Sequence, residues 1–345
     1  MNKKNKIISG VLIVIPVLTL LIGYHYYSKI YHNNVLKNTE LFIPTNTNID
    51  GLTQLLSPII KNTESFKWVA TTKKYSNRIK SGKYAISKGM NNNDLINLLR
   101  SGKQTAVHLS FNNQHLLKNL AGRISTQIEP DSLSLLKAFQ DETFLKKNNF
   151  NLETALAMYI PNSYQVYWNT SAEGFRNKML KEYKIFWNKQ RRRKAKAQNL
   201  TLVEVITLAS IVQKETAHIA ERPIVAGLYL NRYHDQWPLQ ADPTIIYSLK
   251  QKHGQDFEVK RVLLKDLKTD SPYNTYKYRG IPPGPIAMPD ISSIDAVLNP
   301  KKHNYYYMCA NIDEFGKHTF SKTLSEHNRN AQKYQRWISK QGVNR

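Results

Sequence analysis

The first apolar run of the chain is long and carries no charge. Residues 7–27 read IISGVLIVIPVLTLLIGYHYY, about the length that a helix needs to cross a bilayer. Lys3, Lys4 and Lys6 precede the run and favour a cytoplasmic N-terminus. The alternative is a cleaved signal peptide, but the run ends in bulky aromatic residues without a small-residue cleavage pattern. We therefore predict an uncleaved anchor over 7–27, preceded by a cytoplasmic tail over 1–6.

Short alternating and amphipathic runs follow a polar segment at 28–40, which we interpret as a stalk. The runs SGKYAI and QTAVHLSF predict strands, and the spacing of leucines in DLINLLR predicts a helix. Together these patterns predict a small α+β module over 41–110. It contains no cluster of catalytic-type residues, so it is either a packing domain or a glycan-binding module.

Helical periodicity dominates from residue 111. After several short helical runs and a break at 160–171, one continuous helix is predicted over 172–198. A further helix follows in NLTLVEVITLASIVQKETA. It begins with Thr201 and Glu204, the spacing of a capping box.

Eight prolines punctuate the chain between 238 and 300, where we expect loops and short strands. Strands are predicted at 302–310 and 316–322, and a closing helix at 323–341. The predicted fold class is therefore α+β. A transmembrane helix and the small module precede a mixed catalytic domain over 111–345, with a helical part and a Pro-rich loop and strand part.

Charge and cysteine content narrow the function. The formal net charge of +25 indicates attraction to polyanions, either nucleic acid, anionic lipid or an anionic wall polymer. Nucleic acid is disfavoured because the anchor places most of the chain outside the cytoplasm. The single Cys309 permits no intramolecular disulfide, so the outer part must be held together by its core.

A carboxylate continues the apolar stripe of the helix that begins at Thr201. Glu215 follows the stripe at helical spacing and is expected on the face that packs inward. Partial burial would raise its pKa, as a general acid near neutral pH requires. The alternative is a last-turn Glu that pairs with Arg222 or Lys184. The stripe comprises Val205, Leu208, Ile211 and Val212.

Other chemistries find little support in the sequence. The histidines are scattered, with no pair at metal-ligand spacing beside a carboxylate, so we expect no metal. There is no G-x-S-x-G turn and no phosphate-binding glycine loop, and we expect no cofactor. Carboxylate-driven glycoside cleavage is the hydrolytic or lyase chemistry that remains.

Polar and aromatic residues downstream predict a sugar-binding cleft. They combine amide, hydroxyl and carboxyl groups, which suit sugar hydroxyls, with flat rings, which suit pyranose faces. The candidate substrate-binding residues are Gln240, Asp242, Thr244, Tyr273, Asn274, Thr275 and Tyr276.

Several blocks, in this order and spacing, resemble the endolytic murein transglycosylase family, also called YceG-like. They are LASIVQKET, LQADPTIIY, YNTY, GIPPGPIAMP and HTFSKTLSEHN. The resemblance implies a single-pass inner-membrane enzyme with a LysM-like module at 41–110. Its substrate would be the β-1,4 bond between N-acetylmuramic acid and N-acetylglucosamine within peptidoglycan strands. Because the anchor keeps such an enzyme near the membrane, we expect it to act on nascent strands. The family's catalytic glutamate falls on Glu215. Gln213 and Asn162 stand where many members carry Glu and Asp.

The resemblance also implies a mechanism with one carboxylate, in which Glu215 acts first as acid and then as base and leaves a 1,6-anhydro end. Gln240, Asn274 and Tyr276 are expected to hold the sugars, with Asp242 in a positioning role. Expected partners are glycan strands, the cytoplasmic membrane and the peptidoglycan synthases of the elongation machinery. Three alternatives stay open: a hydrolase that uses Glu215 plus Asp242, a non-catalytic wall-binding scaffold, and a nucleic-acid binder.

Overall fold

The computed structural model describes residues 3–340, and its side chains are described over 13–339. The chain forms two compact units. Unit 1 extends to Leu109 and also includes Gln127–Pro130 and Gln165–Ser171. Unit 2 contains the remainder, including all helices from α5 (Leu117–Ser125) onward.

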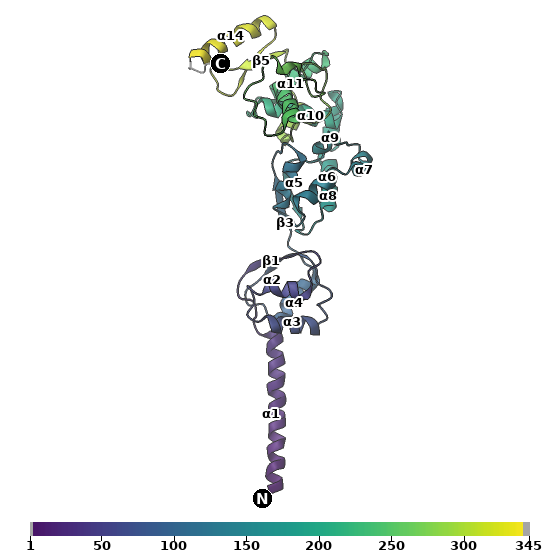
Figure 1. Ribbon diagram of the computed structural model, residues 1–345, viewed down its shortest axis with the longest axis vertical. Coiled ribbons are helices and arrows are strands. Elements are labelled where there is room, and N and C mark those ends of the chain that lie inside the picture. The colour runs from purple at the N-terminus through teal and green to yellow at the C-terminus, as the bar shows by residue number, and fades with distance from the viewer. Residues whose placement is uncertain (1–2, 341–345) are drawn as a thin grey trace. The chain divides into compact units, whose positions relative to one another are not determined.

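An apolar N-terminal helix, α1 (Lys3–Tyr31), is drawn in purple in Figure 1. Its segment Ile13–Tyr31 is long and apolar enough to cross a membrane. Residues 1 and 2 of the predicted cytoplasmic tail over 1–6 lie outside the described residues. Its other four residues already belong to α1, which begins at Lys3. The chain therefore has the apolar helix that the sequence predicts, with bounds that differ at both ends.

Unit 1 folds around one pair of antiparallel strands. Strand β1 (Thr39–Ile43) pairs with β2 (Gly82–Ile86), and α2 (Ile49–Leu56) and α3 (Thr63–Thr72) lie between them in the sequence. Helix α4 (Asn92–Ser101) completes the unit. Asn48, Asn62 and Asn91 cap the three helices through side-chain hydrogen bonds. Apolar residues from every element then pack into one continuous core.

The segment predicted as a polar stalk is instead part of unit 1. Its first residues continue α1 to Tyr31, and Val35 is 2% exposed and bridges to Ile60. Asn92 donates to the carbonyl oxygen of Lys29, one of the carbonyls left unpaired at the end of α1. The prediction of a polar stalk over 28–40 is wrong. Val35, an apolar residue in this otherwise polar segment, packs into the core of unit 1.

Strands β3 (Val107–Phe111) and β4 (Asn162–Val166) pair in a second two-stranded sheet, and unit boundaries fall within both. The sequence indicated only a break where β4 lies.

The first part of unit 2 is helical, as predicted, but the long helix over 172–198 is two helices. The chain breaks between them at Trp187, which is 1% exposed, and Asn188, which caps the second helix through the backbone N–H of Arg191. The elements are α5 (Leu117–Ser125), α6 (Ser132–Phe139), α7 (Glu142–Lys147), the 3₁₀ turn η1 (Ala155–Met158), α8 (Ala172–Phe186) and α9 (Lys189–Ala197).

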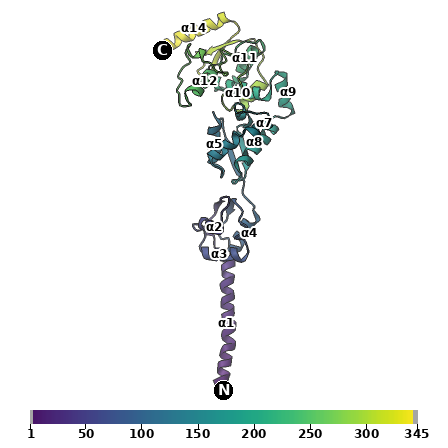
Figure 2. The same ribbon diagram turned by 45° about the vertical axis from the view of Figure 1, so that its right-hand side comes forward.

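The second part of unit 2 surrounds one central helix, α10 (Leu202–Glu215). Figure 2 shows α10 among its neighbours, and it contacts α9, α11, α12 and α13. The Pro-rich region contains two helices, α12 and α13, where loops and short strands were expected. The remaining elements are α11 (Arg222–His234), α12 (Asp242–His253), the 3₁₀ turn η2 (Asp266–Lys268), α13 (Ile291–Leu298), β5 (Tyr307–Ala310), β6 (His318–Ser321) and α14 (Leu324–Lys340).

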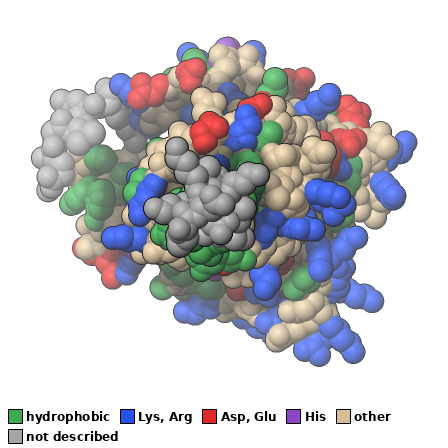
Figure 3. All heavy atoms as spheres, turned by 90° about the horizontal axis from the view of Figure 1, so that it is seen from below, with side chains coloured by type: hydrophobic (Ala, Val, Ile, Leu, Met, Phe, Trp, Pro, Cys, Tyr) green, Lys and Arg blue, Asp and Glu red, His purple; other side chains and the backbone are tan. Residues whose placement is uncertain are grey.

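The prediction of a mixed α+β fold with an apolar N-terminal helix is confirmed. The net charge of +25 is carried by Lys and Arg side chains spread over the surface, as the face in Figure 3 shows, with acidic groups between them.

Candidate active site

Glu215 is the last residue of α10, and the helix is positioned at its other end by the predicted capping box. The Thr201 side chain accepts from the backbone N–H of Glu204, whose carboxylate accepts from the Thr201 N–H. Every residue over 205–212 is buried, so this part of α10 is enclosed on all sides and not only along one stripe. A rigid, buried helix therefore fixes the place of Glu215.

The carboxyl group of Glu215 is held in a protein environment that favours its neutral form. Enclosure raises the pKa of Glu215 to about 7, and the negative charge of Asp242 adds to this. A hydrogen bond from Tyr229 and the charges of His318 and Arg232 oppose the rise. The residue as a whole keeps partial exposure while its carboxyl is surrounded by protein. With a pKa of about 7, about half of the Glu215 carboxyl groups keep their proton at neutral pH, as general acid catalysis requires.

Tyr229 on α11 makes the direct contact with Glu215. Its hydroxyl donates to Glu215 Oε1 over 2.6 Å. Burial and the adjacent carboxyl raise the pKa of Tyr229 well above its ordinary range, so the hydroxyl keeps its proton. The sequence analysis missed this residue, since nothing in the helical pattern of α11 distinguishes it from other buried tyrosines.

Two further groups missed at the sequence level bear on Glu215 through their charge. Arg232 is 7% exposed, and its guanidinium donates to the carbonyl oxygens of Tyr306 and Leu239. His318 on β6 lies 3.0 Å from a carboxylate oxygen of Glu221, measured from Nδ1, and donates its backbone N–H to the same carboxylate. His318 begins the block HTFSK, which was noted in the sequence without a role for its histidine.

The Pro-rich loop packs directly against α10. The backbone N–H of Ile286 donates to Ser210 Oγ over 3.1 Å. Gly284 approaches the carbonyl oxygen of Glu153 so closely that an added Cβ would lie 2.2 Å from it. This loop is therefore packed against the protein at both residues.

Gln213, which stands where many family members carry Glu, has a structural role here. Its side-chain oxygen accepts from the backbone N–H of Asp290 and from Ser293 Oγ, at the start of α13. The amide therefore joins α10 to α13. Asn162 is exposed at the start of β4, where its side chain accepts from the N–H of Ser163.

Gln240, Asp242 and Tyr276 keep polar groups at or near the surface. Asp242 accepts from the Tyr276 hydroxyl over 2.6 Å, and burial raises the pKa of Tyr276 far above its ordinary value. Gln240 is exposed and adopts a φ of 52°, a left-handed conformation uncommon outside glycine. Its backbone is held there by a hydrogen bond from its N–H to the Thr275 carbonyl.

The other predicted substrate-binding residues lie inside the protein. Thr244 and Thr275 join their hydroxyls over 2.8 Å, and Thr275 also accepts from the N–H of Ala241. Asn274 is 0% exposed and uses its side chain within its own loop, where it donates to the carbonyls of Leu267 and Thr269. Tyr273 is 8% exposed. The prediction that Thr244, Asn274 and Thr275 contact the sugars directly is therefore corrected. Their side chains are buried and bond to other parts of the protein.

The chain belongs to the YceG-like family, whose sequence profile matches residues 41–333. A Bacillus subtilis relative named endolytic murein transglycosylase is 31% identical over 310 residues, which is 85% of this chain and 83% of the relative.

A second curated relative and a solved structure are also similar to this chain. A Streptococcus pneumoniae protein of the same name is 28% identical over 331 residues, which is 86% of this chain and 58% of that protein. A crystal structure of a YceG-like protein from Listeria monocytogenes is 28% identical, with a TM-score of 0.55. It aligns over 85% of this chain and 98% of its own.

Proposed function

We propose that this chain is a membrane-anchored endolytic lytic transglycosylase, a lyase that cleaves within peptidoglycan glycan strands. The observation that carries the proposal is Glu215, a carboxyl with a pKa of about 7 at the end of a buried helix. The names of the relatives support the substrate and the reaction class. Helix α1 supports the anchor, and Lys3, Lys4 and Lys6 before its apolar part favour a cytoplasmic N-terminus.

The proposed reaction uses one carboxyl group twice. Neutral Glu215 donates its proton to the glycosidic oxygen between N-acetylmuramic acid and N-acetylglucosamine as the bond from this oxygen to C1 breaks. The positive charge that develops at C1 is relieved when the 6-hydroxyl of the same muramic acid attacks. The Glu215 carboxylate takes up the hydroxyl proton, so the acid is regenerated and no water is consumed.

An internal nucleophile explains how a single carboxylate suffices. The 6-hydroxyl belongs to the sugar that carries C1, and an attack within one molecule has a large entropic advantage. Among the surface groups, Gln240 and Tyr276 are suited to hold sugar hydroxyls and Asp242 to orient Tyr276. The buried Thr244, Asn274 and Thr275 support these groups from below, and Tyr273 contributes its ring against Tyr247.

A hydrolase with two carboxylates is the second candidate, because the charge of Asp242 acts on Glu215. Such an enzyme would add water and release reducing ends.

Residues 41–110 are proposed as a LysM-like module. Two helices that lie in the sequence between the strands of one antiparallel pair support this assignment.

Product analysis tests the proposal. The full chain and its Glu215→Gln variant are incubated with purified peptidoglycan, and the released ends are identified by mass spectrometry. We expect 1,6-anhydro ends from the unmodified chain and none from the variant, with unchanged circular dichroism. Full activity of Glu215→Gln would remove the assignment, and reducing ends would favour the hydrolase.

A further inference from the structure

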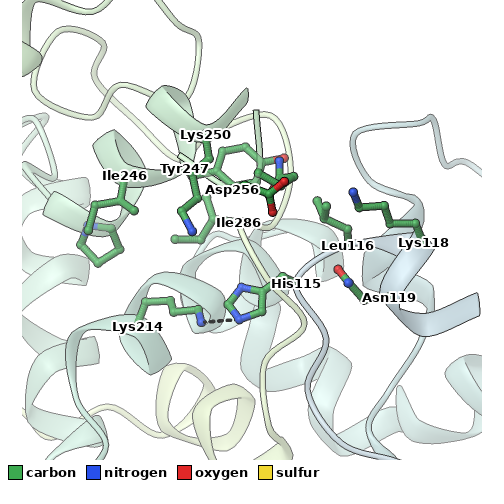
Figure 4. A pocket seen from close by; sticks show the side chains of 12 residues that line it. His115, Leu116, Lys118, Asn119, Lys214, Ile246, Tyr247, Lys250, Asp256 and Ile286 are labelled. Carbon is green, nitrogen blue, oxygen red and sulfur yellow. Dashed lines mark hydrogen bonds between the residues drawn. The ribbon is translucent and has the colours of Figure 1, made fainter. Parts of the chain in front are cut away.

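A pocket of about 390 Å³ lies beside the last turn of α10, and Figure 4 shows the side chains around it. Lys214 of α10 forms part of its wall, Lys118 comes from the first turn of α5, and Lys250 comes from α12. All three helices belong to unit 2. The pocket is therefore built within one unit by segments that are far apart in the sequence.

The charge in this pocket is strongly unbalanced. Lys118, Lys214 and Lys250 contribute three ammonium groups, and none of them forms an ion pair with any side chain over 13–339. The His115 ring adds a fourth nitrogen base, with Nε2 3.4 Å from Lys214 Nζ. Asp256 is the one carboxylate among the lining residues.

The positive groups act on one another across the pocket. Burial and the charge of Lys250 lower the pKa of Lys214. Burial, followed by the charges of Lys214 and Lys250, lowers the pKa of His115. An anion between these groups would relieve the repulsion, because an opposite charge nearby favours the charged form of each base.

Apolar surface lies beside the ammonium groups. Leu116, Ile246, Ile286 and the ring of Tyr247 also line the pocket. A fully hydrated inorganic ion would gain nothing from these groups. The combination suits a carboxylate attached to an aliphatic chain, such as the side chain or terminus of a short peptide.

Two chain positions place the pocket next to the candidate active site. Lys214 immediately precedes Glu215 on α10, and Pro243 of the pocket immediately follows Asp242 on α12. These adjacencies bring the pocket and Glu215 to the same end of α10 and the same start of α12, within reach of a peptide branch of a strand whose glycosidic bond lies at Glu215.

We propose that this pocket binds a carboxylate of the peptide stems that branch from the glycan strand. The inference rests on the proposed function. Because the amino sugars of the strand are N-acetylated and its lactyl groups are amide-linked to the peptides, the negative charge of this substrate lies on the peptide stems. The pocket thereby makes cleavage depend on the presence of peptide at the cut site.

The test compares two substrates and two variants of the full chain in detergent, each variant with two lysines replaced by neutral glutamine. The substrates are intact strands and strands whose peptide carboxylates have been coupled to ammonia with a carbodiimide, which makes them neutral amides. The pocket variant is Lys118→Gln with Lys250→Gln, and the control is Lys181→Gln with Lys184→Gln, two exposed lysines on α8. We expect the pocket variant to lose about fivefold in kcat/KM on intact strands, with a loss under about twofold on amidated strands.

Equal kcat/KM of pocket variant and control on intact strands would overturn the inference, as would an equal loss on both substrates. Inactivity of the unmodified chain on both substrates counts against the proposed function instead. In that case a binding measurement tests the role of the pocket. Chains that carry Glu215→Gln, with and without the two lysine substitutions, are applied to immobilised strands. Tighter retention by intact strands that the two lysine substitutions remove would support it, and equal retention would contradict it.

Discussion

Tyr229 Oη lies 2.6 Å from Glu215 Oε1 and donates to it, which joins the middle of α11 to the end of α10. An Oε1 that accepts from Tyr229 leaves the proton of the neutral carboxyl to Oε2. This contact therefore distinguishes the two oxygens, and Oε2 is the one that would donate to the glycosidic oxygen in the proposed reaction.

Replacement of Tyr229 by Phe removes the hydrogen bond that lowers the pKa of Glu215. The pKa of Glu215 should then rise further, and the alkaline limb of the pH–rate profile should move to higher pH. Stability should fall by about 1–3 kcal/mol, because a hydrogen bond to an ionisable group is lost. The pH dependence of kcat/KM on purified peptidoglycan measures the first effect.

Tyr233→Phe is the matched control, since Tyr233 lies one turn further along α11 and makes no contact with Glu215. It should leave the alkaline limb in place. A profile that moves equally in both variants, or to lower pH in Tyr229→Phe, would contradict the role of the contact.

Asp242→Asn should shift the same limb in the opposite direction. The negative charge of Asp242 raises the pKa of Glu215, so its removal lowers this pKa and activity should decline at lower pH than in the unmodified chain. Released ends should remain 1,6-anhydro in form. A loss of activity on the order of a thousandfold or more would instead indicate that Asp242 is an essential second carboxylate.

Glu215 should also make stability depend on pH. Its pKa is about 7 in the folded chain and near 4.5 when unfolded, so the folded state holds the proton longer. Stability from this group is present below about pH 4.5 and is lost as pH rises through 7. The difference is on the order of 3 kcal/mol.

Glu215→Gln carries no such titration. Thermal unfolding in detergent should give similar midpoints for variant and unmodified chain near about pH 5, and a higher midpoint for the variant near about pH 8.5. Equal midpoints at both values would show that Glu215 is not held in an unfavourable environment.

Gly284→Ala should destabilise unit 2 by about 1–3 kcal/mol, because the new methyl group meets the Glu153 carbonyl at 2.2 Å. Gly122→Ala is the control. It lies inside α5 with open space around it, and alanine should stabilise the helix by about 0.5–1 kcal/mol. A lower thermal midpoint for Gly284→Ala and a higher one for Gly122→Ala, each relative to the unmodified chain, would confirm the packed contact. An unchanged midpoint for Gly284→Ala would exclude it.

Local rules in the sequence predicted the part of the site that lies on α10. The capping box at Thr201 and Glu204 and the spacing of Glu215 are short-range signals, and the structure has both. The surroundings of Glu215 could not be predicted in this way. Tyr229 and His318 reach the region of Glu215 from other elements only after the chain has folded.

Two wrong predictions have a common cause, which is the reading of helix boundaries. The pattern of prolines predicts a loop at Pro243, but this residue lies in the first turn of α12, where a fixed φ is favourable. Helical periodicity predicts that Asn188 lies inside a helix, but asparagine is a preferred N-cap and here it caps α9. Trp187 is buried at this break, a tertiary contact that local periodicity does not predict.

The join between α1 and unit 1 has a mechanical consequence. Tyr26 stacks on Trp68 at 5.1 Å, Asn92 ties the carbonyl of Lys29, and Val35 is locked in the core a few residues later. With α1 in a membrane, no slack chain would separate the bilayer from the first folded unit. The end of α1 and the core of unit 1 would then move together as one rigid body. Motions of the helix within the lipid would be transmitted directly to unit 1, because no flexible linker lies between them.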